Sequence, residues 1–136
     1  MIQRRVVLDA SAILEWLLAR HAKDTIDKLL PVAVIPASAL TEALYVAQLR
    51  GHGLAPDELA AALLSLGVLV EPVTVSDAVR ASELIAVSRR GEHSVGSLSL
   101  GDGLCIAVAE RCELPVVGGD LYWETLDVRI KVLSFR

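Results

Sequence analysis

The sequence has few cysteines and no long apolar run, and these absences exclude several classes of protein. Cys105 and Cys112 are seven positions apart within one predicted helix, a spacing that fits neither a zinc knuckle nor a disulfide framework. No apolar run reaches the roughly 18–20 residues that span a bilayer. Arg4 and Arg5 lead directly into VVLDASAIL, which Asp9 interrupts, so no signal peptide is expected. The sequence therefore predicts a cytoplasmic protein that does not cross a membrane.

An excess of basic residues is also missing. The chain carries 13 Lys and Arg against 17 Asp and Glu, a net charge of −4, so a polyanionic substrate would need a local basic rim. Hydrophobic residues make up 54% of the 136 positions, which fits a sheet covered on both faces with apolar surface left for a partner. This length suffices for one domain with a real core, and we expect a single domain over residues 1–136.

Short apolar runs alternate with helical patterns along the whole chain. We expect strands within residues 4–8, 32–35, 68–75, 115–118 and 130–133, and helices near 11–18, 24–30, 36–50, 56–66, 77–89 and 100–113. Ser38 and Ser76 are expected as N-caps, and Pro72 at the beginning of its strand. The alternation predicts a three-layer α/β/α fold around a mostly parallel sheet of four to five strands.

Four acidic residues are predicted to lie at one edge of this sheet. Asp9 and Asp120 each follow a strand directly, Asp102 lies in the first turn of its helix, and Glu42 lies one turn into another. Ligands of open parallel sheets bind beyond the carboxyl ends of the strands. Each residue also has a structural alternative, because Asp9 and Asp120 could be caps, Asp102 could form a capping box with Ser99, and Glu42 could be a solvated helix residue.

Taken together, the four carboxylates favour a metal site. Caps need not share one edge of a sheet, and Glu42 lies too deep within the apolar SALTEALYVA to be a cap. Crowded carboxylates need a compensating charge. Oxygen ligands without nearby His or Cys favour Mg²⁺ or Mn²⁺ over Zn²⁺. Such an ion suits phosphodiester hydrolysis, because it lowers the pKa of a bound water and stabilises charge on the phosphate.

Four segments in order, VVLDASAIL, SALTEALYVA, LSLGDGLCIAVA and LPVVGGDLYW, resemble the PIN-domain family, and most of all its VapC-type toxin ribonucleases. The similarity runs from Val6 to about Leu133. It implies a Mg²⁺- or Mn²⁺-dependent endoribonuclease whose acidic quartet is Asp9, Glu42, Asp102 and Asp120, with Glu42 acting on the metal through a water. It also implies an RNA substrate, a homodimer and a cognate antitoxin that blocks the site.

The sequence departs from the family at Gly118, where a Thr or Ser often stands two residues before the last acid. Ser11 matches a small polar position beside the first acid and is a candidate substrate-binding residue. Arg89, Arg90 and His93 form a local basic cluster that could contact RNA phosphates, or could simply be a solvated helix end.

Two other functions stay open. Asp9 could be the nucleophile of an aspartyl-phosphate phosphotransferase or phosphatase, although the second acid usual two residues later is replaced by Ser11. The chain could also be a non-catalytic PIN-like binding module whose acids bind a structural ion or a partner's basic tail. Trp16 and Trp123 could stack on bases or anchor a partner, and core packing is the alternative for Trp16.

Overall fold

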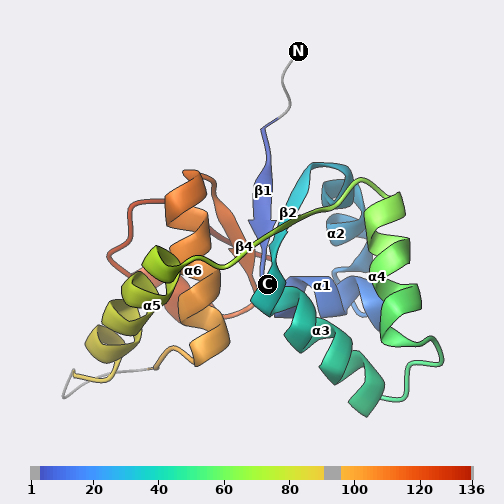
Figure 1. The fold of residues 1–136 in the computed structure, drawn as a ribbon, viewed down its shortest axis with the longest axis horizontal. Coiled ribbons are helices and arrows are strands. Elements are labelled where there is room, and N and C mark those ends of the chain that lie inside the picture. The colour runs from blue at the N-terminus through green and yellow to red at the C-terminus, as the bar shows by residue number, and fades with distance from the viewer. Residues whose placement is uncertain (1–3, 91–95, 136) are drawn as a thin grey trace.

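A five-stranded, all-parallel sheet divides the molecule into three layers (Figure 1). The computed structural model describes residues 4–90 and 96–135. The strands are β1 Val6–Leu8, β2 Ala33–Pro36, β3 Leu69–Glu71, β4 Val116–Gly118 and β5 Val132–Ser134, in the order β3-β2-β1-β4-β5. The α-helices are α1 Ala10–Leu17, α2 Lys23–Leu29, α3 Ala37–Leu49, α4 Pro56–Ser65, α5 Val75–Ser88 and α6 Leu100–Cys112. The predicted architecture is confirmed.

Two short 3₁₀ helices, η1 Leu30–Val32 and η2 Leu121–Thr125, complete the described elements. None of the helices described in residues 4–90 and 96–135 is long and apolar enough to cross a membrane. Helices α1 to α4 lie on one side of β1 and β2, and α5 and α6 lie on the other (Figure 1).

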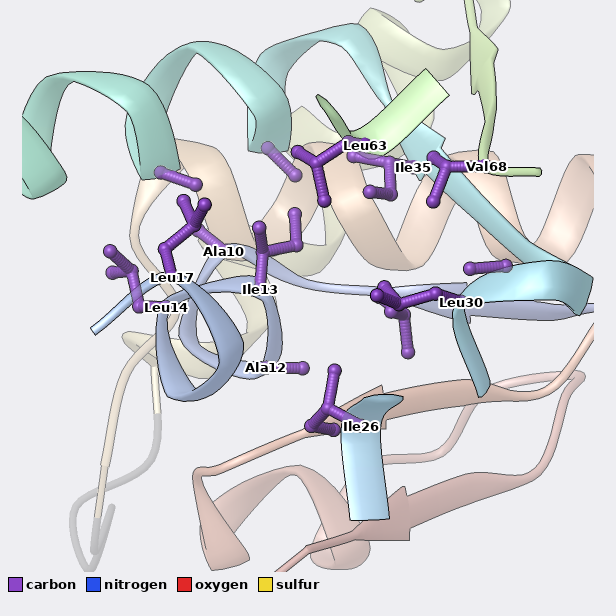
Figure 2. Close-up of a cluster of buried hydrophobic side chains, with 14 of the residues drawn as sticks. Ala10, Ala12, Ile13, Leu14, Leu17, Ile26, Leu30, Ile35, Leu63 and Val68 are labelled. Atoms are coloured by element: carbon purple, nitrogen blue, oxygen red, sulfur yellow. The ribbon is translucent and has the colours of Figure 1, made fainter. Parts of the chain in front are cut away.

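Alternation along the strands supplies both faces of the sheet with apolar side chains. Successive residues of a strand point to opposite faces. Leu8 and Ile35 accordingly pack with α1 to α4, the cluster of buried side chains drawn in part in Figure 2. Val7 and Val34 point the other way and pack with α5, α6 and Trp123. Both faces are therefore covered, as the apolar composition indicated.

Three expected details at the ends of elements were wrong. Thr74, not Ser76, caps α5, because its side chain and that of Asp77 form a reciprocal capping box. Helix α3 begins at Ala37, directly after Pro36, so Ser38 lies inside the first turn and its buried Oγ has no partner among the described residues. Strand β3 ends before Pro72, which has no N–H to extend the parallel ladder.

The order of the strands positions the site. The chain passes from β1 outward to β2 and β3 and then crosses over through α5 and α6 to β4, on the other side of β1. The switch in direction therefore falls between β1 and β4, which pair through Val7–Val116 and Leu8–Val117. Asp9 follows β1, and the segment Gly119–Asp120 follows β4. Ligand sites of open α/β sheets form at such a point.

Candidate active site

Asp9 is the most buried of the four carboxylates, with 6% of the residue exposed. Its Oδ1 accepts the N–H of Ala12 at 2.8 Å and thereby caps α1. The hydroxyl of Ser11 donates to the same carboxylate, 2.7 Å from Oδ1 and 2.8 Å from Oδ2. The pKa of Asp9 is raised to about 6. Burial is the largest cause, the charges of Asp102 and Glu42 add to it, and these hydrogen bonds act against it.

Ser11 connects the ends of the two central strands. While its hydroxyl donates to Asp9, its Oγ accepts the N–H of Gly119 at 3.1 Å. The segment after β4 is therefore tied to the carboxylate that follows β1. Although it was predicted to bind substrate, Ser11 has a structural role that the sequence did not reveal.

Asp102 and Asp120 have capping roles and also face the site. Asp102 Oδ2 accepts the N–H of Ser99 at 3.3 Å, and Ser99 Oγ accepts the N–H of Asp102, which closes a capping box at the start of α6. Asp120 Oδ1 accepts the N–H of Tyr122 and caps η2. Burial first, and then the charge of Asp120, raises the pKa of Asp102. The capping alternative is confirmed for both residues, and both also line the cavity described below, so capping does not exclude a role in a site.

Glu42 reaches the first turn of α6 from α3. A Cβ on Gly101 would lie 3.1 Å from Glu42 Oε2, so the missing side chain lets the carboxylate approach Asp102. Partial burial and then the charge of Asp102 raise the pKa of Glu42. Although its neighbours in the sequence are apolar, the residue as a whole is exposed, as its alternative as a solvated helix residue predicts. It makes no hydrogen bond or ion pair with any residue of the described ranges.

A cavity of about 420 Å³ opens where these groups meet. It is lined by Asp9, Ser11, Asp102, Gly119, Asp120 and Leu121, of which none is basic. Cys105 lies buried beneath it, and burial followed by the charges of Asp9, Asp102 and Glu42 raises the pKa of its thiol. Within residues 4–90 and 96–135, no three acidic, histidine or cysteine side chains are grouped as a ready-made metal site. The site thus gathers negative charge, and none of the described residues that line it is basic.

Gly118 and Trp123 form a part of the site that the sequence did not predict. Trp123 is 1% exposed and its Nε1–H has no partner among the described residues, so the proposal that it stacks on bases is wrong. A Cβ on Gly118 would lie 2.9 Å from the indole and 3.1 Å from Asp9 Oδ2. The indole thus occupies the space that a hydroxyl side chain at position 118 would need.

The other candidates among the described residues do not line the cavity. Arg89 is exposed at the end of α5, and its Nη2 donates to the carbonyl of Leu98 at 3.4 Å. Arg90 is exposed, and His93 lies outside the described residues. Trp16 is partly buried against the core and donates its Nε1–H to Asp27 at 2.8 Å, so its packing alternative is confirmed.

A second charged cluster lies between α5 and α6, far along α6 from Asp102. We call it the ion-pair network, and it consists of Glu71, Asp77, Arg80, Glu83, Glu110, Arg111 and Arg129. Arg111 contacts Asp77 at 2.9 Å and Glu71 at 2.9 Å, and Arg80 contacts Glu110 at 2.7 Å. Burial, the largest single influence, acts to raise the pKa values of Asp77 and Glu110. Their arginine partners, together with the hydrogen bonds that Asp77 makes with Thr74 and that Glu110 accepts from the N–H of Arg129, outweigh burial and lower both values.

The chain belongs to the PIN domain family, whose sequence profile matches residues 6–127. None of the curated protein sequences compared matches the chain. Among solved structures, it is similar to VapC20 of Mycobacterium tuberculosis, a sarcin-ricin loop cleaving toxin, with 20% identity, a TM-score of 0.70, and coverage of 93% of this chain and 98% of that one.

Two complexes give similar matches. A toxin–antitoxin complex from Klebsiella pneumoniae shares 15% identity at a TM-score of 0.71, covering 96% of this chain and 98% of that one. DNA-bound VapBC from Salmonella typhimurium shares 19% identity at a TM-score of 0.69, covering 98% and 100%. At these identities the likeness concerns the fold.

Proposed function

We propose that this chain is a metal-dependent endoribonuclease and the toxin of a toxin–antitoxin pair. The observation that carries the proposal is the group of four carboxylates beyond β1 and β4, three of which line one cavity without a basic residue among its described lining. Membership of the PIN domain family and the similarity to toxin structures support the choice of reaction and of partner.

The donor set fits Mg²⁺ or Mn²⁺. It consists of oxygens, and the raised pKa values of Asp9, Asp102 and Glu42 mark a place where added positive charge is favourable. Asp9, Asp102 and Asp120 would hold the ion, and Glu42 would act through a water. When bound, the ion supplies a water of lowered pKa and stabilises charge on the phosphate.

The chain's own residues orient the site. Ser11 holds the carboxylate of Asp9 and, through Gly119, the segment that carries Asp120. The capping box leaves the Oδ1 of Asp102 without a partner among the described residues. Arg89 and Arg90, both exposed, would contact RNA phosphates outside the cavity. Exposed apolar side chains such as Tyr45 and Leu49 on α3 are consistent with a homodimer and an antitoxin as partners.

RNA cleavage by the purified protein, freed of any partner, tests the proposal. We expect cleavage with Mg²⁺ or Mn²⁺ and none in EDTA. Asp102→Asn should lower the rate more than about 100-fold, since losing a ligand should exceed the 10–100-fold effect of a supporting residue. Its amide oxygen can still accept the N–H of Ser99, so the fold should survive.

Asp127→Asn is the matched control, because Asp127 is exposed and does not line the cavity. It should cleave RNA at the parent rate. Cleavage that persists in EDTA or in Asp102→Asn would contradict the proposal. Retention of Mn²⁺ without any cleavage would instead favour the non-catalytic binding module, and a phosphoryl adduct on Asp9 would favour the phosphotransferase.

A further inference from the structure

The indole of Trp123 and the carboxylate of Asp9 both lie close to the position that a Cβ on Gly118 would take. A Cβ added to Gly118 would lie 2.9 Å from Cζ3 and 3.0 Å from Cε3 of Trp123, and 3.1 Å from Asp9 Oδ2. Ring and carboxylate therefore border the same small space, which is free for them only because position 118 has no side chain. Because two adjacent ring carbons lie at nearly the same distance, the rigid edge of the six-membered ring of Trp123 faces Gly118.

The position of the indole is fixed from two directions. The N–H of Trp123 donates to the carbonyl of Asp120 at 3.1 Å, within the turn that the Asp120 side chain caps. The ring is buried with Val7, Val116 and Leu98 in the cluster beneath α5 and α6. Its Nε1–H has no partner among the described residues, so packing rather than a side-chain hydrogen bond holds it.

We propose that Trp123 is a positioning residue of the acidic site, and that its indole forms the apolar wall against which Asp9 is held for its ligand. The Ser11 hydroxyl lies within hydrogen-bond distance of both carboxylate oxygens and holds the carboxylate with a proton shared between them. The indole borders the space above Gly118, which Oδ2 also borders. Held in this way, the carboxylate loses rotational freedom before the ligand arrives. This inference rests on the proposed function in taking Asp9 as a metal ligand.

Two substitutions and their combination test the wall. Mn²⁺ binding is measured from the electron paramagnetic resonance signal of the free ion. Gly118→Ala places a methyl group where the indole lies, and Trp123→Phe shortens the ring and opens a gap. Each should weaken Mn²⁺ binding about tenfold, the effect typical of residues that orient a ligand. The double variant should bind within about threefold of the parent, because the methyl group fills the gap left by the shorter ring.

Leu63→Ala is the control for lost stability. Leu63 is 1% exposed in the other core cluster, on the opposite face of the sheet, and its truncation leaves a comparable cavity. It should bind Mn²⁺ as the parent does at a temperature where all variants are folded. Each variant's far-ultraviolet circular dichroism and cooperative thermal unfolding confirm that it is folded before binding is measured, since Trp123→Phe itself removes one of the two tryptophans.

The outcomes separate this inference from the proposed function. If the unsubstituted protein does not retain Mn²⁺, the acidic metal site fails and the wall fails with it. If the parent binds Mn²⁺ and both single variants bind it equally well, only the wall is refuted. A double variant that binds Mn²⁺ no more tightly than the weaker of the two single variants would also refute the wall. So would a Leu63→Ala variant that binds Mn²⁺ as weakly as the single variants do.

Discussion

Buried carboxylates near the two ends of helix α6 are in opposite electrostatic states: Asp9 caps α1, Asp77 lies on α5 and Glu110 lies on α6 itself. Near its first turn, Asp9 is 6% exposed and its pKa is raised, to about 6. Near its last turn, Asp77 and Glu110 are 1% and 8% exposed, and the pKa of each is lowered. Burial penalises the charged form at both ends, so the difference comes from the partners.

At the ion-pair network, arginines supply the compensating charge from within the chain. Arg111 and Arg80 lie 2.9 Å and 2.7 Å from the carboxylates of Asp77 and Glu110. No described residue does the same for Asp9, whose partners are a hydroxyl and a backbone N–H. The carboxylates of Asp77 and Glu110, which stabilise the fold, are thus paired with arginines. The carboxylate of Asp9, which we propose binds a cation, has no cationic partner among the described residues. Five substitutions and one titration can break or sharpen this contrast.

Arg111→Met should have the largest effect on stability. It would leave Asp77 charged, buried and without its cation, and breaking such a pair costs about 3 kcal/mol, or roughly 10 °C in Tm. Thermal unfolding in EDTA measures the loss. Adding Asp77→Asn should recover part of it, because the amide carries no charge. Mn²⁺ binding should stay at the parent level, and a parallel loss of binding would show that the two ends of α6 are not independent.

Asp9→Asn should act in the opposite direction at pH 7. The raised pKa means that the charged form of Asp9 is less favourable in the folded chain than in the unfolded one, so removing the charge should stabilise the metal-free protein by roughly 1–3 kcal/mol. Asn caps a helix as well as Asp does. Urea unfolding in EDTA measures the gain. With saturating Mn²⁺ the order should reverse, since only the parent gains binding free energy.

The pH dependence of Tm in EDTA should separate the two regions. The contribution of Asp9 is fully present below its ordinary pKa of 3.8 and is lost as the pH rises through about 6, so Tm should rise as the pH falls from 7 to 5. Asp77 and Glu110 have lowered pKa values, so their contributions are present at higher pH and are lost below about pH 4. Asp9→Asn should reduce the first change, leaving the part due to the raised pKa values of Asp102 and Glu42, and should leave the acid limb unaltered.

Much of the fold could be predicted because it depends on local pattern. Short apolar runs alternate with helical patterns along the chain, and this alternation predicted a parallel sheet. The caps were predicted less well. Thr74 and Ser76 are both eligible near the start of α5, and the spacing of Thr74 and Asp77 is the same capping-box spacing that Ser99 and Asp102 share, so this cap was predictable. The burial of Asp77 is not visible in the sequence.

The site could be predicted only in part, for a physical reason. Asp9 and Asp120 follow strands, and Glu42 and Asp102 lie near the starts of helices α3 and α6, so a shared edge was predictable. Capping was treated as an alternative to a site, although one carboxylate can do both. The contact of Trp123 with Gly118 depends on how η2 folds back, and no periodicity encodes it. The pairing of Asp77 with Arg111 spans 34 positions, so the sequence showed two charges but not their partnership.

Glu83→Gln should have the smallest effect, and it tests whether burial decides what a pair contributes. Arg80 contacts both Glu83, at 3.4 Å, and Glu110, at 2.7 Å. The Glu83 side chain is 59% exposed and that of Glu110 is 3% exposed. Water screens the first pair, so Glu83→Gln should change the free energy of unfolding by less than about 0.5 kcal/mol and lose even that in high salt.

Glu110→Gln is the matched variant, because it removes the same charge from the same arginine. It should cost several times more, since Glu110 also accepts the N–H of Arg129 at 3.1 Å and holds its charge away from water. Urea unfolding of both variants at low and high salt gives the comparison. Equal losses would mean that burial does not set the strength of these pairs. The missing cation beside Asp9 would then be weaker grounds for proposing a metal there.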